Sequence, residues 1–77
     1  MTKLEEKLVE LEYHPITEYM YSKDFDKCYI LITICENIIF NYGVSSTDFI
    51  RENEDIDNLQ QALNEMKKDL KILKEAF

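Results

Sequence analysis

The chain has 77 residues, of which 45% are hydrophobic, and its 16 acidic and 9 basic residues give a net charge of −7. A chain of this length forms one domain, and domains this small bury only about 60% of the surface that the unfolded chain exposes, so self-association is a common source of stability. The acidic balance disfavours direct binding of nucleic acid, which needs Lys and Arg facing phosphates, and suits a protein partner with a basic surface.

The sequence predicts a cytoplasmic protein. No stretch approaches the roughly 18 apolar residues of a membrane span, and no apolar signal region follows the charged opening "MTKLEEKLVE". Cys28 and Cys35 lie seven positions apart, so a single strand would send them to opposite faces, beyond the reach of a disulfide. Free, buried-type thiols are typical of a reducing compartment.

Residues 2–12 are predicted to form a short helix. Thr2 followed three residues later by Glu5 fits a capping box, in which each side chain satisfies a main-chain N–H of the other. Pro15 lies just beyond the segment and favours extended geometry before it, so the helix should end near residue 12. Its apolar face consists of Leu4, Leu8 and Leu11.

A three-stranded antiparallel meander is expected next. The polar run "SKDFDK" at 22–27 and the pair Glu36-Asn37 are typical of tight connections between strands. The predicted strands span about residues 16–22, 27–35 and 38–45.

The central strand is apolar on both faces, which usually means that both are covered. The all-aliphatic face, Cys28 with Ile30, Ile32 and Ile34, suits the core. Tyr-rich surfaces are typical of partner interfaces, although an ordinary exposed face, or one covered by loops, would carry the same pattern. We expect the outer face to be lined by Tyr19, Tyr21, Tyr29 and Leu31.

The C-terminal helix is predicted over about residues 54–76. Asn53 is a suitable N-cap, and acidic side chains in the first turn match the positive end of the helix dipole. Apolar residues then recur at spacings of three and four in an unbroken seam. The seam consists of Ile56, Leu59, Leu63, Met66, Leu70, Leu73 and Phe77.

This helix should be about 33 Å long, against about 26 Å for an eight-residue strand. We therefore expect its end, with Leu70, Leu73 and Phe77, to overhang the sheet and to need a further partner. The first helix could cover these residues, or a second copy could cover them in a homodimer.

The order helix, three strands, helix predicts a single α+β domain over residues 1–77, with the helices packed as one layer on the sheet. No catalytic, cofactor-binding or metal-binding residues are predicted. His14 is a lone histidine without an acid or nucleophile beside it, and both cysteines lie among apolar residues. The acidic run "ENEDID" lacks the glycine and terminal Glu of a calcium loop, and no glycine-rich phosphate loop is present. We expect a protein that is not an enzyme.

Three functions remain open. The first is protein binding through the Tyr-lined face, and the second is self-assembly through the C-terminal helix. The third is mimicry of nucleic acid by an acidic surface, although lysines are interspersed among the acids. The candidate acidic surface consists of Glu52, Glu54, Asp55 and Asp57.

The ending "DIDNLQQALNEMKKDLKILKEAF", with the opening "KLEEKL" and the hairpin "YSKDFDKCYI", closely resembles small, mostly uncharacterised proteins encoded by phages and prophages of low-GC Gram-positive bacteria. The resemblance implies a phage accessory protein of the host cytoplasm. It implies a modulator or inhibitor of another protein, such as a host enzyme, a defence nuclease or a repressor. The shared motifs are structural, so no catalytic residue is carried over.

Overall fold

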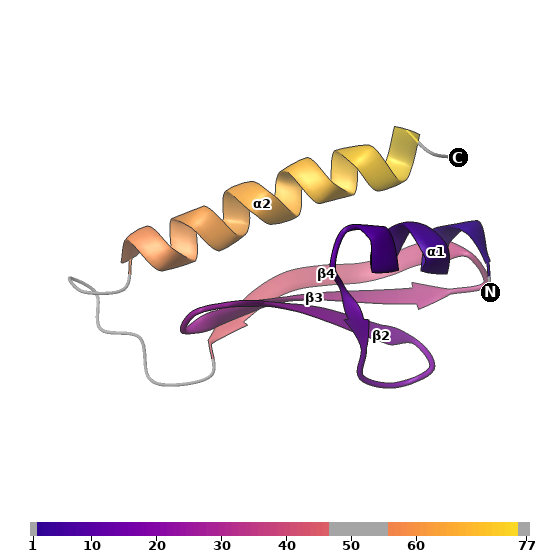
Figure 1. Cartoon of the computed structure of the whole chain (residues 1–77), viewed down its shortest axis with the longest axis horizontal. Helices are drawn as coiled ribbons and strands as arrows, with labels where there is room; N and C mark the ends of the chain where they lie inside the picture. Colours follow the sequence, from indigo (N-terminus) through magenta and orange to yellow (C-terminus); the bar gives the residue numbers. More distant parts are fainter. Residues whose placement is uncertain (1, 47–55, 76–77) are drawn as a thin grey trace.

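The computed structural model describes residues 2–46 and 56–75. Its fold is α+β: an antiparallel sheet forms one layer, and both helices lie over the same face of it (Figure 1). The elements in chain order are α1 (Lys3–Glu10), β1 (His14–Pro15), β2 (Met20–Phe25), β3 (Cys28–Cys35), β4 (Ile38–Ser46) and α2 (Ile56–Glu75).

The sheet has four strands in the order β1-β2-β3-β4, where the sequence predicted three. The first half of the first predicted strand, residues 16–22, forms a loop. The side chain of Thr17 accepts hydrogen bonds from the main-chain N–H groups of Tyr19 and Met20, at 3.2 and 3.1 Å. Such local side-chain bonds compete with strand pairing, so β2 begins at Met20 and runs on to Phe25, through the segment predicted as a connection.

Helix α1 begins after Thr2, whose side chain accepts a hydrogen bond from the N–H of Glu5 at 3.2 Å. At its other end Tyr13 donates its N–H to the carbonyl of Leu8, and Glu12 donates to Val9. This pair of bonds is the Schellman motif, which needs a left-handed residue after the helix. Glu12 fills that position with φ of 72°.

The core lies between the sheet and the helices. Directly opposite residues of paired strands point to the same face of the sheet. α2 packs over one face of β3 and β4, and this face carries the core. The buried apolar side chains are Leu4, Leu8, Tyr13, Tyr21, Cys28, Ile30, Ile32, Ile34, Ala62, Met66, Leu70 and Leu73.

Leu73, on the helix end that was expected to need a further partner, is 0% exposed. α1 lies beside the C-terminal half of α2 (Figure 1), and Leu4 and Leu73 line the same small hollow. The first helix therefore covers this end of α2, which was one of the two alternatives. Phe77 lies outside the described residues.

Candidate protein-binding surface

The two faces of β3 differ as the sequence predicts, because no described helix lies over the second face (Figure 1). Tyr29, Leu31 and Thr33 point to this open face and are half-buried. Most of their neighbours across the strands are small or polar: Leu31 pairs with Ser22 on one side and Gly43 on the other, and Met20, opposite Thr33, is the exception. The open face is therefore an apolar stripe with polar margins.

Two of the expected tyrosines are not on this face. Tyr21 pairs with Ile32 and is 5% exposed, so it belongs to the core and its assignment to the outer face is wrong. Burial, and then the charge of Glu5, raises the pKa of its phenol. Tyr19 lies in the loop before β2 and is exposed. The register of β2 on β3 decides these positions, and a sequence alone does not give the register.

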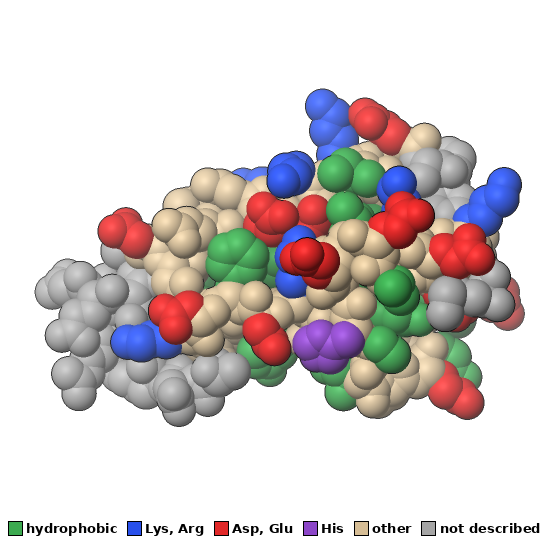
Figure 2. All heavy atoms as spheres, viewed as in Figure 1, with side chains coloured by type: hydrophobic (Ala, Val, Ile, Leu, Met, Phe, Trp, Pro, Cys, Tyr) green, Lys and Arg blue, Asp and Glu red, His purple; other side chains and the backbone are tan. Residues whose placement is uncertain are grey.

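The expected acidic surface falls mostly on residues that are not described. Glu52, Glu54 and Asp55 lie outside the described ranges, as does the predicted cap Asn53, and Asp57 is exposed in the first turn of α2. Over the face seen in Figure 2, acidic and basic side chains are intermixed. That face is not uniformly negative.

The sequence did not single out the edge strand β4, yet it carries three of the exposed large apolar side chains in the described part of the chain, including the two with the highest exposed fractions. Phe40 is 77% exposed, Ile38 66% and Tyr42 50%. A β-bulge contributes to this exposure: Thr33 pairs with Asn41 and Ile34 pairs with Ile39, so Phe40 is an extra residue without a partner on β3.

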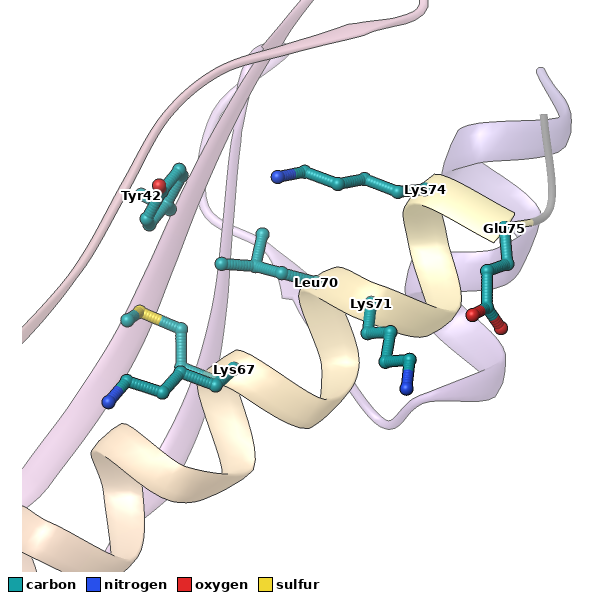
Figure 3. Close-up of a pocket in the computed structure, with 7 residues that line it drawn as sticks. Tyr42, Lys67, Leu70, Lys71, Lys74 and Glu75 are labelled. Carbon is teal, nitrogen blue, oxygen red and sulfur yellow. The ribbon is translucent and has the colours of Figure 1, made fainter.

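A groove follows the junction of β4 and α2 (Figure 3). Its larger part, of about 570 Å³, has Tyr42 on one wall and Met66 and Leu70 of the helix on the other. A second hollow of about 290 Å³ continues it and shares Lys74 with it. The second hollow is lined by Leu4, Asn37, Ile38, Ile39, Leu73 and Lys74.

Lysine side chains line the larger part of the groove. Lys67, Lys71 and Lys74 are exposed, and none forms an ion pair with any residue in the described ranges. Glu75 is the single acidic residue among those described around the groove. On a chain with a net charge of −7, this groove is locally basic.

The opposite flank of α2 holds a polar cluster that sequence reasoning missed, composed of Tyr13, Lys23, Glu65 and Asp69. Lys23 Nζ lies 3.1 Å from both Glu65 Oε1 and Asp69 Oδ2, and the Tyr13 hydroxyl donates to Asp69 Oδ2 at 3.0 Å. Asp69 is 0% exposed. The signal was present in the sequence, because Asp69 stands in a stripe with Ala62, Met66 and Leu73 that also repeats at four and three residues.

The electrostatics of the cluster favour its ion pairs. Burial alone would lower the pKa of Lys23, but hydrogen bonds to Asp69 and Glu65 and their charges outweigh it and raise that pKa. The hydrogen bond from Lys23 is the main cause that lowers the pKa of Glu65. Burial, and then Asp69, raises the pKa of Tyr13 well above its usual range. A protonated lysine has no lone pair for nucleophilic attack, so this arrangement suits a structural tie between β2 and α2.

The remaining candidates for chemistry are dispersed. His14 is exposed in β1, while Cys28 is buried and Cys35 is exposed on the opposite face of β3, which corrects the expectation that both thiols are buried. No group of three or more His, Cys, Asp or Glu side chains in the described ranges could hold a metal ion. Neither described helix is both long enough and apolar enough to cross a membrane.

Comparisons of the chain with models of protein families, with curated proteins and with solved structures find no match.

Proposed function

We propose that this chain is a non-catalytic binding protein that docks on another protein through β4 and the groove beside it. The observation that supports this most is the exposure of Ile38, Phe40 and Tyr42 on one edge strand. Large apolar side chains that cluster at a sheet edge, next to a groove, are typical of interaction sites. The open face, with Tyr29 and Leu31, lies on the other side of the same sheet and extends the candidate surface.

The resemblance of the C-terminal helix to phage and prophage proteins is the reason to propose a partner in a bacterial host or in a rival mobile element. Under this proposal the chain acts in the host cytoplasm as a modulator or inhibitor of that partner. Self-assembly through the helix end has less support, because Leu73 is covered within its own chain. Mimicry of nucleic acid has less support as well, because three lysines surround the groove.

The test is site-specific photo-crosslinking in a low-GC Gram-positive host. A benzophenone side chain replaces Phe40 in one variant and the exposed Val9 of α1 in a matched control. We expect one host or mobile-element protein to be cross-linked from position 40 and not from position 9. The purified partner should then bind the wild-type chain about 30-fold more tightly than the Phe40→Asp variant, as for an interface hot spot.

The proposal fails if position 40 gives no specific adduct, or if the purified partner binds the Phe40→Asp variant as tightly as the wild type. The Val9→Asp variant serves as the control for a new surface charge. It should bind like the wild type.

A further inference from the structure

We infer that the groove between α2 and β4 receives an extended, acidic segment of the partner, which pairs with β4 as a fifth strand. The inference rests on the proposed function and adds to it the chemistry of the partner. Its three supports are the edge of β4 that no second described strand pairs with, the apolar groove beside that edge and the lysines around the groove.

The main chain of β4 is suited to strand addition. β4 spans nine residues at the edge of the described sheet, and only β3 pairs with it there. The N–H of Tyr42 donates to the side-chain oxygen of its neighbour Asn41 at 2.9 Å. In an antiparallel ladder, alternate residues direct their N–H away from the partner strand. We take this bond to a side chain as the sign that the N–H of Tyr42 points to the outer edge, where an added strand could replace the Asn41 side chain.

The groove offers sites for the side chains of such a strand. In Figure 3 the side chain of Leu70 points from α2 toward the strand that carries Tyr42. The larger hollow and the smaller one follow one another along β4 and meet at Lys74. Alternate side chains of an added strand point to the same face, so two consecutive hollows suit apolar residues at every second position.

The charges decide in favour of an acidic segment. Lys67, Lys71 and Lys74 are spaced by four and three residues, so they form one stripe on the helix surface. On the other flank of α2 the carboxylates of Glu65 and Asp69 are already paired with lysines. Carboxylates in the groove would supply partners for the lysine stripe, whereas lysines or arginines there would be repelled.

The same charges disfavour a second copy of the chain as the occupant. Edge-to-edge pairing of two β4 strands about a two-fold axis would bring the two α2 helices close together, because α2 lies over β3 and β4. Each lysine stripe would then approach its own copy. The two chains also repel each other through their net charges of −7.

The test selects binders from a library of displayed random peptides, with the whole chain as bait. The Phe40→Asp variant serves for counter-selection, so that only ligands that depend on β4 are retained. We expect the selected peptides to contain at least three times as many Asp and Glu as Lys and Arg, with apolar residues at alternate positions. Their affinity should fall about tenfold between about 0.05 and 0.5 M salt, because exposed charges are screened.

Two variants and one modified peptide separate the contribution of the lysine charges from that of the main-chain hydrogen bonds. The Lys67→Gln, Lys71→Gln, Lys74→Gln variant should bind the selected peptides about tenfold more weakly, since each exposed pair contributes little by itself. The matched Lys3→Gln variant alters an exposed lysine of α1 and should bind as the wild type does. Methylation of alternate main-chain nitrogens of the peptide should abolish binding, because it removes the hydrogen bonds of strand addition.

Neutral or basic selected peptides, or an affinity unchanged in the triple lysine variant, would overturn the acidic occupant. A Phe40-dependent dimer in light scattering would overturn it as well, in favour of a second copy. These failures differ from failure of the proposed function. A partner cross-linked from position 40 would still show protein binding at β4, through a segment of other chemistry.

Discussion

At the scale of single residues, four non-glycine positions have positive φ: Glu12, Asp26, Glu36 and Asn37, all within the described ranges. Asn and Asp tolerate this conformation, whereas Glu carries the full steric penalty of its Cβ. Glu36 and Asn37 both have positive φ, as the type I′ turn between β3 and β4 requires. Glu12 is the left-handed residue of the Schellman motif, a position that usually belongs to glycine.

Replacement of Glu12 by Gly is therefore expected to stabilise the protein by about 1 kcal/mol, because it removes the Cβ clash without breaking the two main-chain bonds of the motif. The free energy of unfolding in urea measures this change. The matched control is Glu6→Gly in the interior of α1, where glycine costs about 1 kcal/mol. If both substitutions changed the free energy of unfolding in the same direction, the left-handed assignment of Glu12 would be contradicted.

The polar cluster gives a second prediction at this scale. Lys23→Met alone should destabilise the protein by about 3 kcal/mol or more, because it leaves Asp69 charged, buried and without its cation. The triple variant Tyr13→Phe, Lys23→Met, Asp69→Leu should have a free energy of unfolding that is within about 1 kcal/mol of the wild-type value, or higher than it. Asp69 Oδ1 has no hydrogen-bond partner among the described residues, which favours the apolar replacement.

Urea titrations of the two variants measure the comparison. If the triple variant were as unstable as the single one, the cluster would contribute more than the packing that replaces it.

At the scale of elements, periodicity predicted both helices well, and the cap predicted at Thr2 is present at the start of α1. The seam of α2 and the cap at Thr2 are local signals that need no knowledge of neighbours in space. Local signals failed in the segment 16–22, because the Thr17 turn competes with the β propensity of its neighbours. They also could not place Tyr21, whose face depends on pairing with a distant strand. The bulge that exposes Phe40 depends likewise on the register between strands.

The two faces of the sheet should respond differently to the same charge. Tyr21→Asp introduces a carboxylate into the core and is expected to cost more than about 3 kcal/mol. Leu31→Asp lies on the open face between Ser22 and Gly43, and should cost about 1 kcal/mol. Thermal unfolding of the two variants measures the difference. Loss of the fold in Leu31→Asp would mean that the open face is part of the core.

At the scale of the whole molecule, charge is distributed unevenly, although the total is acidic. α2 divides two regions: carboxylates tied to Lys23 on the side of β2, and lysines without described partners on the side of β4. The net charge alone suggested a basic partner, whereas the lysines around the groove are the reason for the acidic segment proposed above. A total charge describes solubility and long-range repulsion, but the local arrangement decides what binds.

Because the polar cluster joins the segment after α1 to β2 and α2, its titration should contribute to the pH range in which the whole fold is stable, together with that of Tyr21, whose pKa burial also raises. The folded state raises the pKa of Tyr13 above 10.0 and that of Lys23 above 10.5. Above these values the unfolded chain loses protons that the folded chain keeps, so unfolding becomes more favourable as pH rises. The contribution of both groups is complete below about pH 10 and is lost above it.

At acidic pH the dependence has the opposite sign, because stability is lost as pH falls. Lys23 lowers the pKa of Glu65 below 4.5. The contribution of Glu65 to stability is therefore present above that pH and is lost as pH falls. We therefore expect a plateau of stability between about pH 5 and pH 10. Above it, the free energy of unfolding should fall by up to about 1.4 kcal/mol per pH unit for each proton released.

Urea titrations at a series of pH values measure both limits. The Tyr13→Phe variant should fall less steeply above pH 10 and equally at the acidic limit. An alkaline slope unchanged in that variant would assign the proton release to other groups.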